Sequence, residues 1–142
     1  MDIAALILWL VTALGGFAML GIWIQRGGPR GGASRLPVPV VFGHFALAAA
    51  GLVVWIVYVI TGKDALAWTA FGLLIPVALL GFAMLARWIP VYQAAARGTG
   101  GSGDGGAPPE RHFPVPFVAG HGLFAVATVI LVLLTALGVG GS

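Results

Sequence analysis

The sequence has no cysteine and very few charged residues. Without a thiol, the chain cannot form a disulfide, a zinc–thiolate centre, a cysteine-ligated iron–sulfur cluster or a thiol nucleophile. Charged residues make up 8% of the 142 positions, against about 25% in soluble domains, and 60% of the positions are hydrophobic. This composition excludes a water-soluble globule and predicts a polytopic membrane protein.

Long apolar runs are what the sequence has in abundance. A helix needs about 20 residues to cross the roughly 30 Å hydrocarbon core of a bilayer. Four stretches meet this length: Ile3 to Ile24, Val38 to Thr61, Leu66 to Ile89 and Pro114 to Leu137. We therefore predict an all-α fold, a four-helix transmembrane bundle that makes residues 1–142 one integral membrane domain. The glycine-rich segment 98–109 is predicted to be a flexible loop.

The sparse charges predict the orientation of the bundle. Seven basic and four acidic residues give a net charge of +3, which is too small and too dispersed to indicate a nucleic-acid partner. Six of the seven basic residues lie in or beside the connections after the first and third helices. Because cytoplasmic loops are enriched in Lys and Arg, we expect both connections to be cytoplasmic and both termini to lie on the opposite side. The expected location is a bacterial-type inner membrane.

An internal repeat is the most informative pattern. Residues 14–23 (LGGFAMLGIW) and 79–88 (LLGFAMLARW) are identical at seven of ten positions. Residues 36–44 (LPVPVVFGH) and 113–121 (FPVPFVAGH) share Pro, Val, Pro, Val, Gly and His in register. The repeat predicts two copies of a helical hairpin, 3–61 and 66–137, related by a pseudo-two-fold axis along the membrane normal. The recurring Trp23 and Trp88 are expected to be interfacial anchors.

Two of the three histidines, His44 and His121, occupy equivalent positions in the repeat. Each is expected about 10 to 15 Å inside its helix, where an ionisable side chain normally has a partner or a task. Small residues surround both of them and leave space beside an imidazole: Gly43, Ala48, Gly120 and Ala125. We expect the two imidazoles to ligate one metal centre, and the most economical centre is a haem b with two histidine ligands.

Haem b carries propionates, which require cations near the water interface. Arg35, Arg87 and Arg111 are expected at the cytoplasmic ends of the helices and are the candidates. With this histidine pair, its small neighbours and its basic rim, the chain resembles membrane b-type cytochromes built from histidine-bearing four-helix bundles. The resemblance implies one-electron transfer, with quinone as a partner.

Two other readings stay open. The histidines can serve only as interhelical hydrogen-bonding groups, in a non-catalytic accessory subunit that binds no cofactor and packs beside a larger membrane complex. Met19 and Met84 are also equivalent in the repeat, and two thioethers with two imidazoles would suit copper.

The polar residues that are missing exclude further classes of function. The predicted helix interiors have no Asp, Glu or Lys, so a proton-coupled antiporter of the small-multidrug type would lack its carboxylate. No Ser/His/Asp arrangement can be assembled from so few polar residues, so we expect no hydrolytic activity. The expected partners are lipid and other membrane proteins or further copies of the chain.

Overall fold

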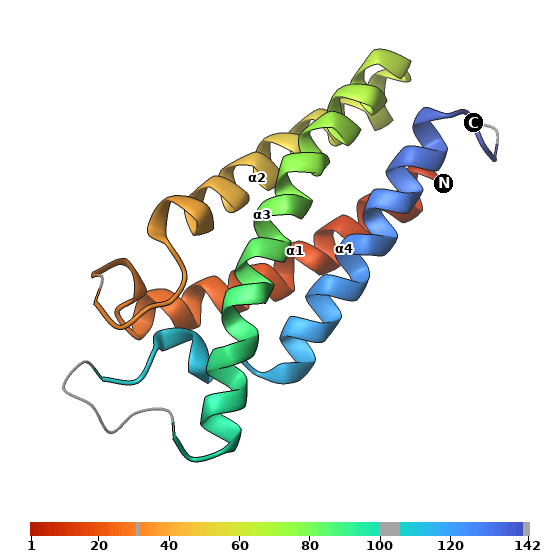
Figure 1. Cartoon of the computed structure of the whole chain (residues 1–142). Helices are drawn as coiled ribbons and strands as arrows, with labels where there is room; N and C mark the ends of the chain where they lie inside the picture. The colour runs from red at the N-terminus through yellow and green to blue at the C-terminus, as the bar shows by residue number, and fades with distance from the viewer. Residues whose placement is uncertain (31, 100–105, 141–142) are drawn as a thin grey trace.

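The computed structural model describes residues 1–30, 32–99 and 106–140 and is helical (Figure 1). Its long helices are α1 (Asp2–Gln25), α2 (Val38–Thr61), α3 (Asp64–Ala96) and α4 (Val115–Ala136). Two short 3-10 turns, η1 (Gly28–Arg30) and η2 (Pro109–His112), lie in the connections. Each of the four long helices is apolar and long enough to cross a membrane, so the predicted all-α fold with four helices of membrane-spanning length is confirmed.

The helix boundaries agree with the sequence prediction except in α3. The bounds of α2 are as predicted, and those of α1 and α4 differ by one residue at each end. The third helix continues seven residues past Ile89, through Pro90, to Ala96. Its extension is held by side chains, because Trp88 and Val91 are buried and the Trp88 ring stacks on Tyr92 at 5.2 Å between ring centres. Of the loop predicted at 98–109, residues 100–105 lie outside the described part.

Proline and glycine set the ends of α2 and α4. Pro37 and Pro114 precede these helices in an extended conformation, and a second proline follows two residues later in each. A proline in the first turn lacks only an N–H that would have no helical acceptor. The second helix ends at Gly62, whose φ of 66° is left-handed, and the Gly62 N–H donates to the Tyr58 carbonyl at 2.7 Å.

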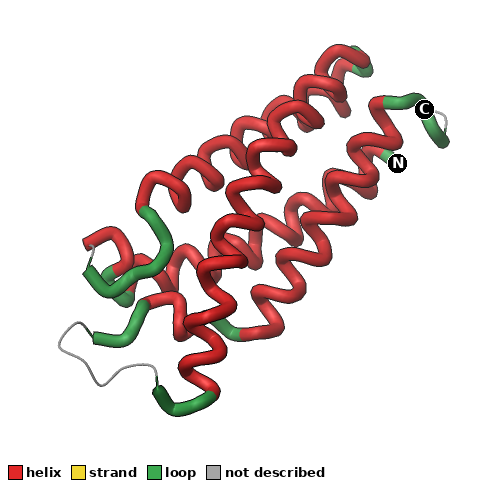
Figure 2. Tube along the Cα trace, in the orientation of Figure 1, coloured by secondary structure: helices red, strands yellow, loops and turns green. Residues whose placement is uncertain are grey.

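The helices pack closely in two pairs, and neither pair joins the two helices of a predicted repeat hairpin. The first helix packs mainly on α4, and α2 packs mainly on α3. Both termini lie at one end of the molecule together with the α2–α3 turn, and the two longer connections lie at the other end (Figures 1 and 2).

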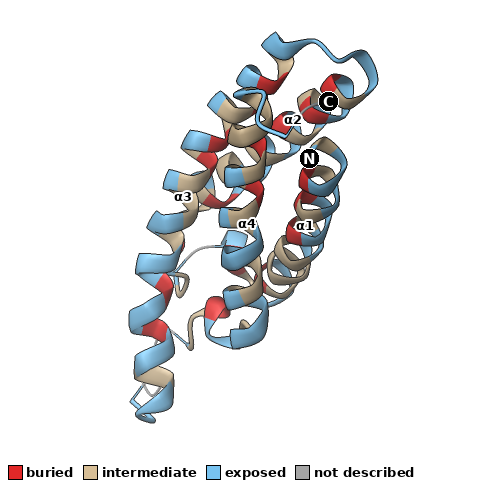
Figure 3. Cartoon of the chain, turned by 90° about the vertical axis from the view of Figure 1, so that its right-hand side faces the viewer, coloured by how far each residue is buried: buried red, intermediate tan, exposed pale blue. Residues whose placement is uncertain are grey.

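Buried side chains form two clusters along the molecule. The cluster near the termini is centred on Trp9 and Trp55, whose ring centres are 6.5 Å apart. The cluster near the long connections contains Trp23, Leu36 and Val41. Outside these clusters, large apolar side chains are exposed on all four helices, as lipid-facing surfaces require. Exposed positions run along the lengths of the helices (Figure 3).

Candidate metal centre

His44 and His121 occupy matching places in their helices. Each is the seventh residue, six positions after the first residue of α2 or α4, and each is half-buried. Six residues correspond to about 9 Å of helix, which is close to the depth expected from the sequence. Along the chain the two histidines form a layer between the two buried clusters: His44 lies between Val41 and Trp55, and His121 lies between Phe113, which precedes α4, and Val132.

Each imidazole is held by a backbone carbonyl of the neighbouring helix. Nδ1 of His44 lies 2.9 Å from the carbonyl oxygen of Val77 in α3, and Nδ1 of His121 lies 2.8 Å from that of Thr12 in α1. A carbonyl oxygen can only accept, so Nδ1 must carry the hydrogen in both rings. In a neutral imidazole the lone pair then lies on Nε2, which is the tautomer required of a metal ligand whose other nitrogen donates to a second partner.

The two rings lie close to one another across the bundle. Their centres are 6.2 Å apart and their planes are inclined at 58°. Two metal–nitrogen bonds of about 2 Å, with about 1 Å from each nitrogen to its ring centre, give about 6 Å for two imidazoles on opposite sides of one metal. The spacing of the ring centres is therefore compatible with one shared metal. No group of three or more His, Asp or Glu side chains that could hold a metal ion is present in the described residues.

Glycines on the neighbouring helices make room for both rings. A Cβ on Gly16 would lie 3.0 Å from Cε1 of His121, and one on Gly81 would lie 3.3 Å from Cε1 of His44. These two glycines are equivalent in the sequence repeat, as are Thr12 and Val77. Both glycines lie within the sequence repeat, but nothing in the sequence connects them with the histidines.

The small residues expected beside the histidines occupy more open positions. A Cβ on Gly120 would meet no atom within 4 Å, and one on Gly43 would lie 3.8 Å from the side chain of Leu80. Ala48 and Ala125, one turn further along their helices, are half-buried. The close contacts to the imidazoles therefore come from α1 and α3.

Of the three arginines proposed for propionates, the structure brings two together. Nη1 of Arg87 donates to the carbonyl oxygen of Arg35 at 3.3 Å. Arg87 lies within α3, nine residues before its end, because α3 is longer than predicted. Arg111 lies in η2, and all three side chains are exposed.

The methionines have different surroundings. Met84 packs against the cluster of Trp23, Leu36 and Val41. Met19 is half-buried in α1. Core packing accounts for Met84, because an unbranched thioether fills irregular space among apolar groups.

A buried carboxylate connects the two long loops, and the sequence did not indicate it. Glu110 is fully buried, and its Oε2 accepts the Ser34 hydroxyl hydrogen at 3.0 Å while its Oε1 accepts the Arg35 N–H. The indole N–H of Trp23 donates to Ser34 Oγ at 2.9 Å, and that of Trp88 donates to the Glu110 carbonyl at 3.1 Å. Both tryptophans are buried, so the prediction that they are interfacial anchors is wrong.

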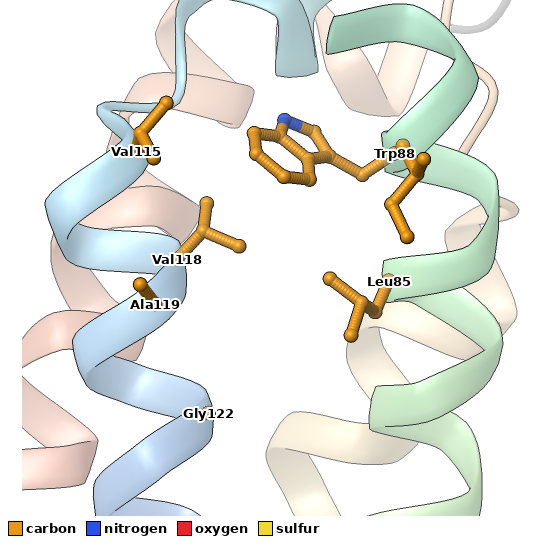
Figure 4. A pocket seen from close by; sticks show the side chains of 7 residues that line it. Leu85, Trp88, Val115, Val118, Ala119 and Gly122 are labelled. Carbon is orange, nitrogen blue, oxygen red and sulfur yellow. The ribbon is translucent and has the colours of Figure 1, made fainter. Parts of the chain in front are cut away.

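An apolar cavity of about 330 Å³ opens between α3 and α4. Its walls are formed by Leu85, Trp88 and Ile89 of α3 and by Val115, Val118, Ala119 and Gly122 of α4. The labelled side chains of the two helices face each other across this space (Figure 4). Comparison of the chain with models of protein families, with curated proteins and with solved structures found no match.

Proposed function

We propose that the protein is a membrane electron carrier that binds one haem b between His44 and His121. The observation that supports this function is the imidazole pair itself. Two rings with 6.2 Å between their centres each have Nδ1 committed to a carbonyl and Nε2 left as the lone-pair atom. A histidine ligand needs this arrangement, since its second ring nitrogen fixes both tautomer and orientation.

The donor set fits haem better than a bare ion. A porphyrin supplies the four equatorial nitrogens of its iron, so two axial imidazoles complete the coordination. A bare metal ion would need further protein ligands, and the described residues offer no cluster of three His, Asp or Glu side chains. The two buried clusters on either side of the histidine layer would keep water from this site. Haem, when bound, supplies a one-electron redox couple.

The remaining residues of the site would bind and orient the cofactor. The Thr12 and Val77 carbonyls hold the two rings in position. Arg35, Arg87 and Arg111 stand at the end of the bundle where carboxylates would emerge, and a guanidinium is suited to bidentate binding of a carboxylate. The candidate electron donors and acceptors are a mobile quinone and a neighbouring membrane protein, because the described helices expose apolar surface along their length.

We further propose that the chain is a duplicated hairpin with pseudo-two-fold symmetry about the membrane normal. Support comes from paired contacts: Thr12 and Val77 are 65 residues apart, as are Gly16 and Gly81, and each contacts the histidine of its neighbouring helix. The connections that contain η1 and η2 would face the cytoplasm of a bacterial-type inner membrane, since most of the basic residues lie there.

The competing function is that of a cofactor-free accessory subunit. The same histidine–carbonyl hydrogen bonds favour it, because an interhelical bond of this kind stabilises membrane helices by about 0.6 kcal/mol on average. Copper held by the histidines with Met19 and Met84 is a third candidate. These three functions differ in what the purified protein contains.

Asparagine substitutions separate ligation from hydrogen bonding. In His44→Asn and His121→Asn the side-chain amide can still donate to the Val77 or Thr12 carbonyl, but it cannot replace an imidazole on iron. We expect the wild-type protein, purified and titrated with haemin, to show the sharp α-band of a low-spin b-type haem after dithionite reduction. Each asparagine variant should lose that band and keep its helical content.

The outcomes identify the function. A colourless wild-type protein that binds no haemin, with asparagine variants as stable as wild type and alanine variants less stable, would overturn haem binding and support the accessory subunit. Co-migration with larger proteins in a mild detergent extract would strengthen that reading. Stoichiometric copper that is lost from Met19→Leu and Met84→Leu would overturn haem binding in favour of the copper site.

A further inference from the structure

Three basic side chains come together at the end of the bundle that carries the long connections. Arg26 follows the last turn of α1, and Arg111 and His112 belong to η2. All three side chains are exposed. Partial desolvation lowers the pKa of His112, and the positive charges of Arg26 and Arg111 lower it further, so both guanidinium groups lie within electrostatic range of the imidazole. We call these three residues the basic cluster.

Hydrogen bonds fix the two parts of the basic cluster relative to each other. The Trp23 indole N–H donates to Ser34 Oγ at 2.9 Å, and the Ser34 hydroxyl donates to Glu110 Oε2 at 3.0 Å. Trp23 lies three residues before Arg26, and Glu110 immediately precedes Arg111. These bonds and the packing of η2 on α1 hold the cations near one another. Their mutual repulsion cannot be relieved by separation unless this network breaks.

The acidic residues lie elsewhere or are buried. The sequence has four of them. Asp2 and Asp64 begin α1 and α3 at the opposite end of the molecule, and Asp104 lies outside the described part. Glu110 is fully buried, and both of its carboxylate oxygens accept hydrogen bonds from the first long connection. A surface on which exposed cations are held together attracts an anion from outside the chain.

Exposed apolar side chains adjoin the basic cluster on its membrane side. The first helix and α4 pack together, and both reach the cluster with one end. Ile24 near the end of α1 is 45% exposed, and Phe117 in the first turn of α4 is 46% exposed. Cations beside exposed apolar side chains, at the ends of two membrane-length helices, match an amphiphile with an anionic head and hydrocarbon tails. A soluble acidic protein would have no use for the apolar part.

We propose that the basic cluster binds the phosphate group of an anionic phospholipid whose acyl chains lie against the exposed apolar side chains of α1 and α4. Guanidinium groups bind phosphate oxygens through charge-assisted hydrogen bonds. The imidazole of His112 adds a ring N–H donor. This inference goes beyond the proposed function, because Arg26 and His112 are not among the residues proposed to bind the haem. Arg111 is a candidate for a propionate as well, so the test leaves Arg111 unchanged.

Lipid binding by the purified protein in detergent tests this assignment. Native mass spectrometry counts the bound molecules of phosphatidylglycerol and phosphatidylcholine when both are added in equal amounts, and circular dichroism follows thermal unfolding of the same samples. We expect the wild-type protein to retain phosphatidylglycerol preferentially and to unfold at a higher temperature in its presence. Arg26→Gln should weaken phosphatidylglycerol binding about fivefold, because one cation near the anionic headgroup is lost.

Two further variants make the comparison specific. Arg26→Lys keeps the positive charge and should retain most of the preference for phosphatidylglycerol. Arg97→Gln is the matched control, since it makes the same change of charge at an exposed residue that follows α3 and lies outside the basic cluster. It should bind phosphatidylglycerol as the wild-type protein does. Equal losses in Arg26→Gln and Arg97→Gln would show that the lipid responds only to total charge, and the proposed site would be wrong.

The remaining outcomes identify the anion. Equal retention of the two phospholipids would overturn the inference. Inorganic phosphate that raises the unfolding temperature as much as phosphatidylglycerol would replace the lipid by a free anion, and stronger protection by poly-glutamate would replace it by an acidic protein. Haemin titration separates this inference from the proposed function. A wild-type protein that binds no haemin but retains phosphatidylglycerol through Arg26 would support the lipid site while the haem site fails.

Discussion

Cε1 of His121 lies so near the α1 backbone that a methyl group on Gly16 would stand 3.0 Å from it. That separation is shorter than ordinary contact, so either the ring or the helix must move when the methyl group is added. The ring is also held by its hydrogen bond to the carbonyl of Thr12, one turn before Gly16 in the same helix. Gly16 is thus a positioning residue for His121.

We therefore predict that Gly16→Ala weakens haemin binding more than Gly81→Ala. The added methyl group at position 81 would lie 3.3 Å from Cε1 of His44, so the imidazole there must move less. Gly21→Ala serves as the control, because no atom lies within 4 Å of its added Cβ. It should leave haemin binding unchanged and stabilise the helix by up to about 1 kcal/mol. Equal haemin affinities in all three variants would show that the glycines do not position the imidazoles.

Removal of the Glu110 carboxylate should destabilise the end of the bundle that carries the long loops. In Glu110→Ala the Ser34 hydroxyl and the Arg35 N–H lose a buried acceptor. An unpaired buried donor costs about 1 to 3 kcal/mol. Thermal unfolding in detergent should begin at a lower temperature, and Glu110→Gln, which keeps one carbonyl oxygen, should lose less stability. An alanine variant as stable as wild type would contradict this role of the carboxylate.

His112 is predicted to titrate below the ordinary histidine range. Partial desolvation lowers its pKa, and the positive charges of Arg26 and Arg111 lower it further. Because the folded state then holds the proton less tightly than the unfolded state, stability should fall as the pH drops below about 6.5. With His44 and His121 both replaced by Asn, His112 is the one remaining histidine, so its NMR titration is unambiguous. Arg26→Gln should raise the measured pKa, and no rise would exclude the charge effect.

Single-cysteine labelling tests the orientation, because the chain contains no native cysteine. Arg30 at the end of η1 and Lys63 in the α2–α3 turn are exposed at opposite ends of the molecule. With an impermeant maleimide added to intact cells, Lys63→Cys should be labelled and Arg30→Cys should react only after lysis. The reverse pattern would invert the proposed topology. Ser34 is unsuitable for labelling, since its hydroxyl hydrogen-bonds with Trp23 and Glu110.

The long helices were predictable because length and apolarity alone determine a membrane span. The end of α3 was not, because its continuation past Pro90 depends on Trp88 contacting Glu110 of η2, a contact between residues 22 apart. The burial of Glu110 could not be predicted from the sequence either. A lone carboxylate in a loop rich in glycine and proline is expected to be solvated, and its partners Ser34 and Arg35 lie more than 70 residues away.

At the candidate site, the sequence indicated which side chains to consider but not what holds them. The repeat identified His44 and His121 from matching residue types. The acceptors on Thr12 and Val77 are backbone carbonyls, which every residue has, so no residue type indicates them. Ala119 and Gly122 are small residues in the wall of the cavity between α3 and α4. The cavity could not be predicted from them, because it becomes apparent only once the two helices are placed beside each other.

The pairing of α1 with α4 affects how the chain reaches its final form in the membrane. The second and third helices are joined by a two-residue turn and can pack as soon as both have been inserted. The first helix has its main partner in the last one made. During synthesis, α1 must therefore remain in the bilayer without that partner until α4 arrives, and Thr12 cannot bind His121 before then. Assembly of the histidine pair is thus a late event, and a cofactor held between the two rings would be captured only by the complete chain.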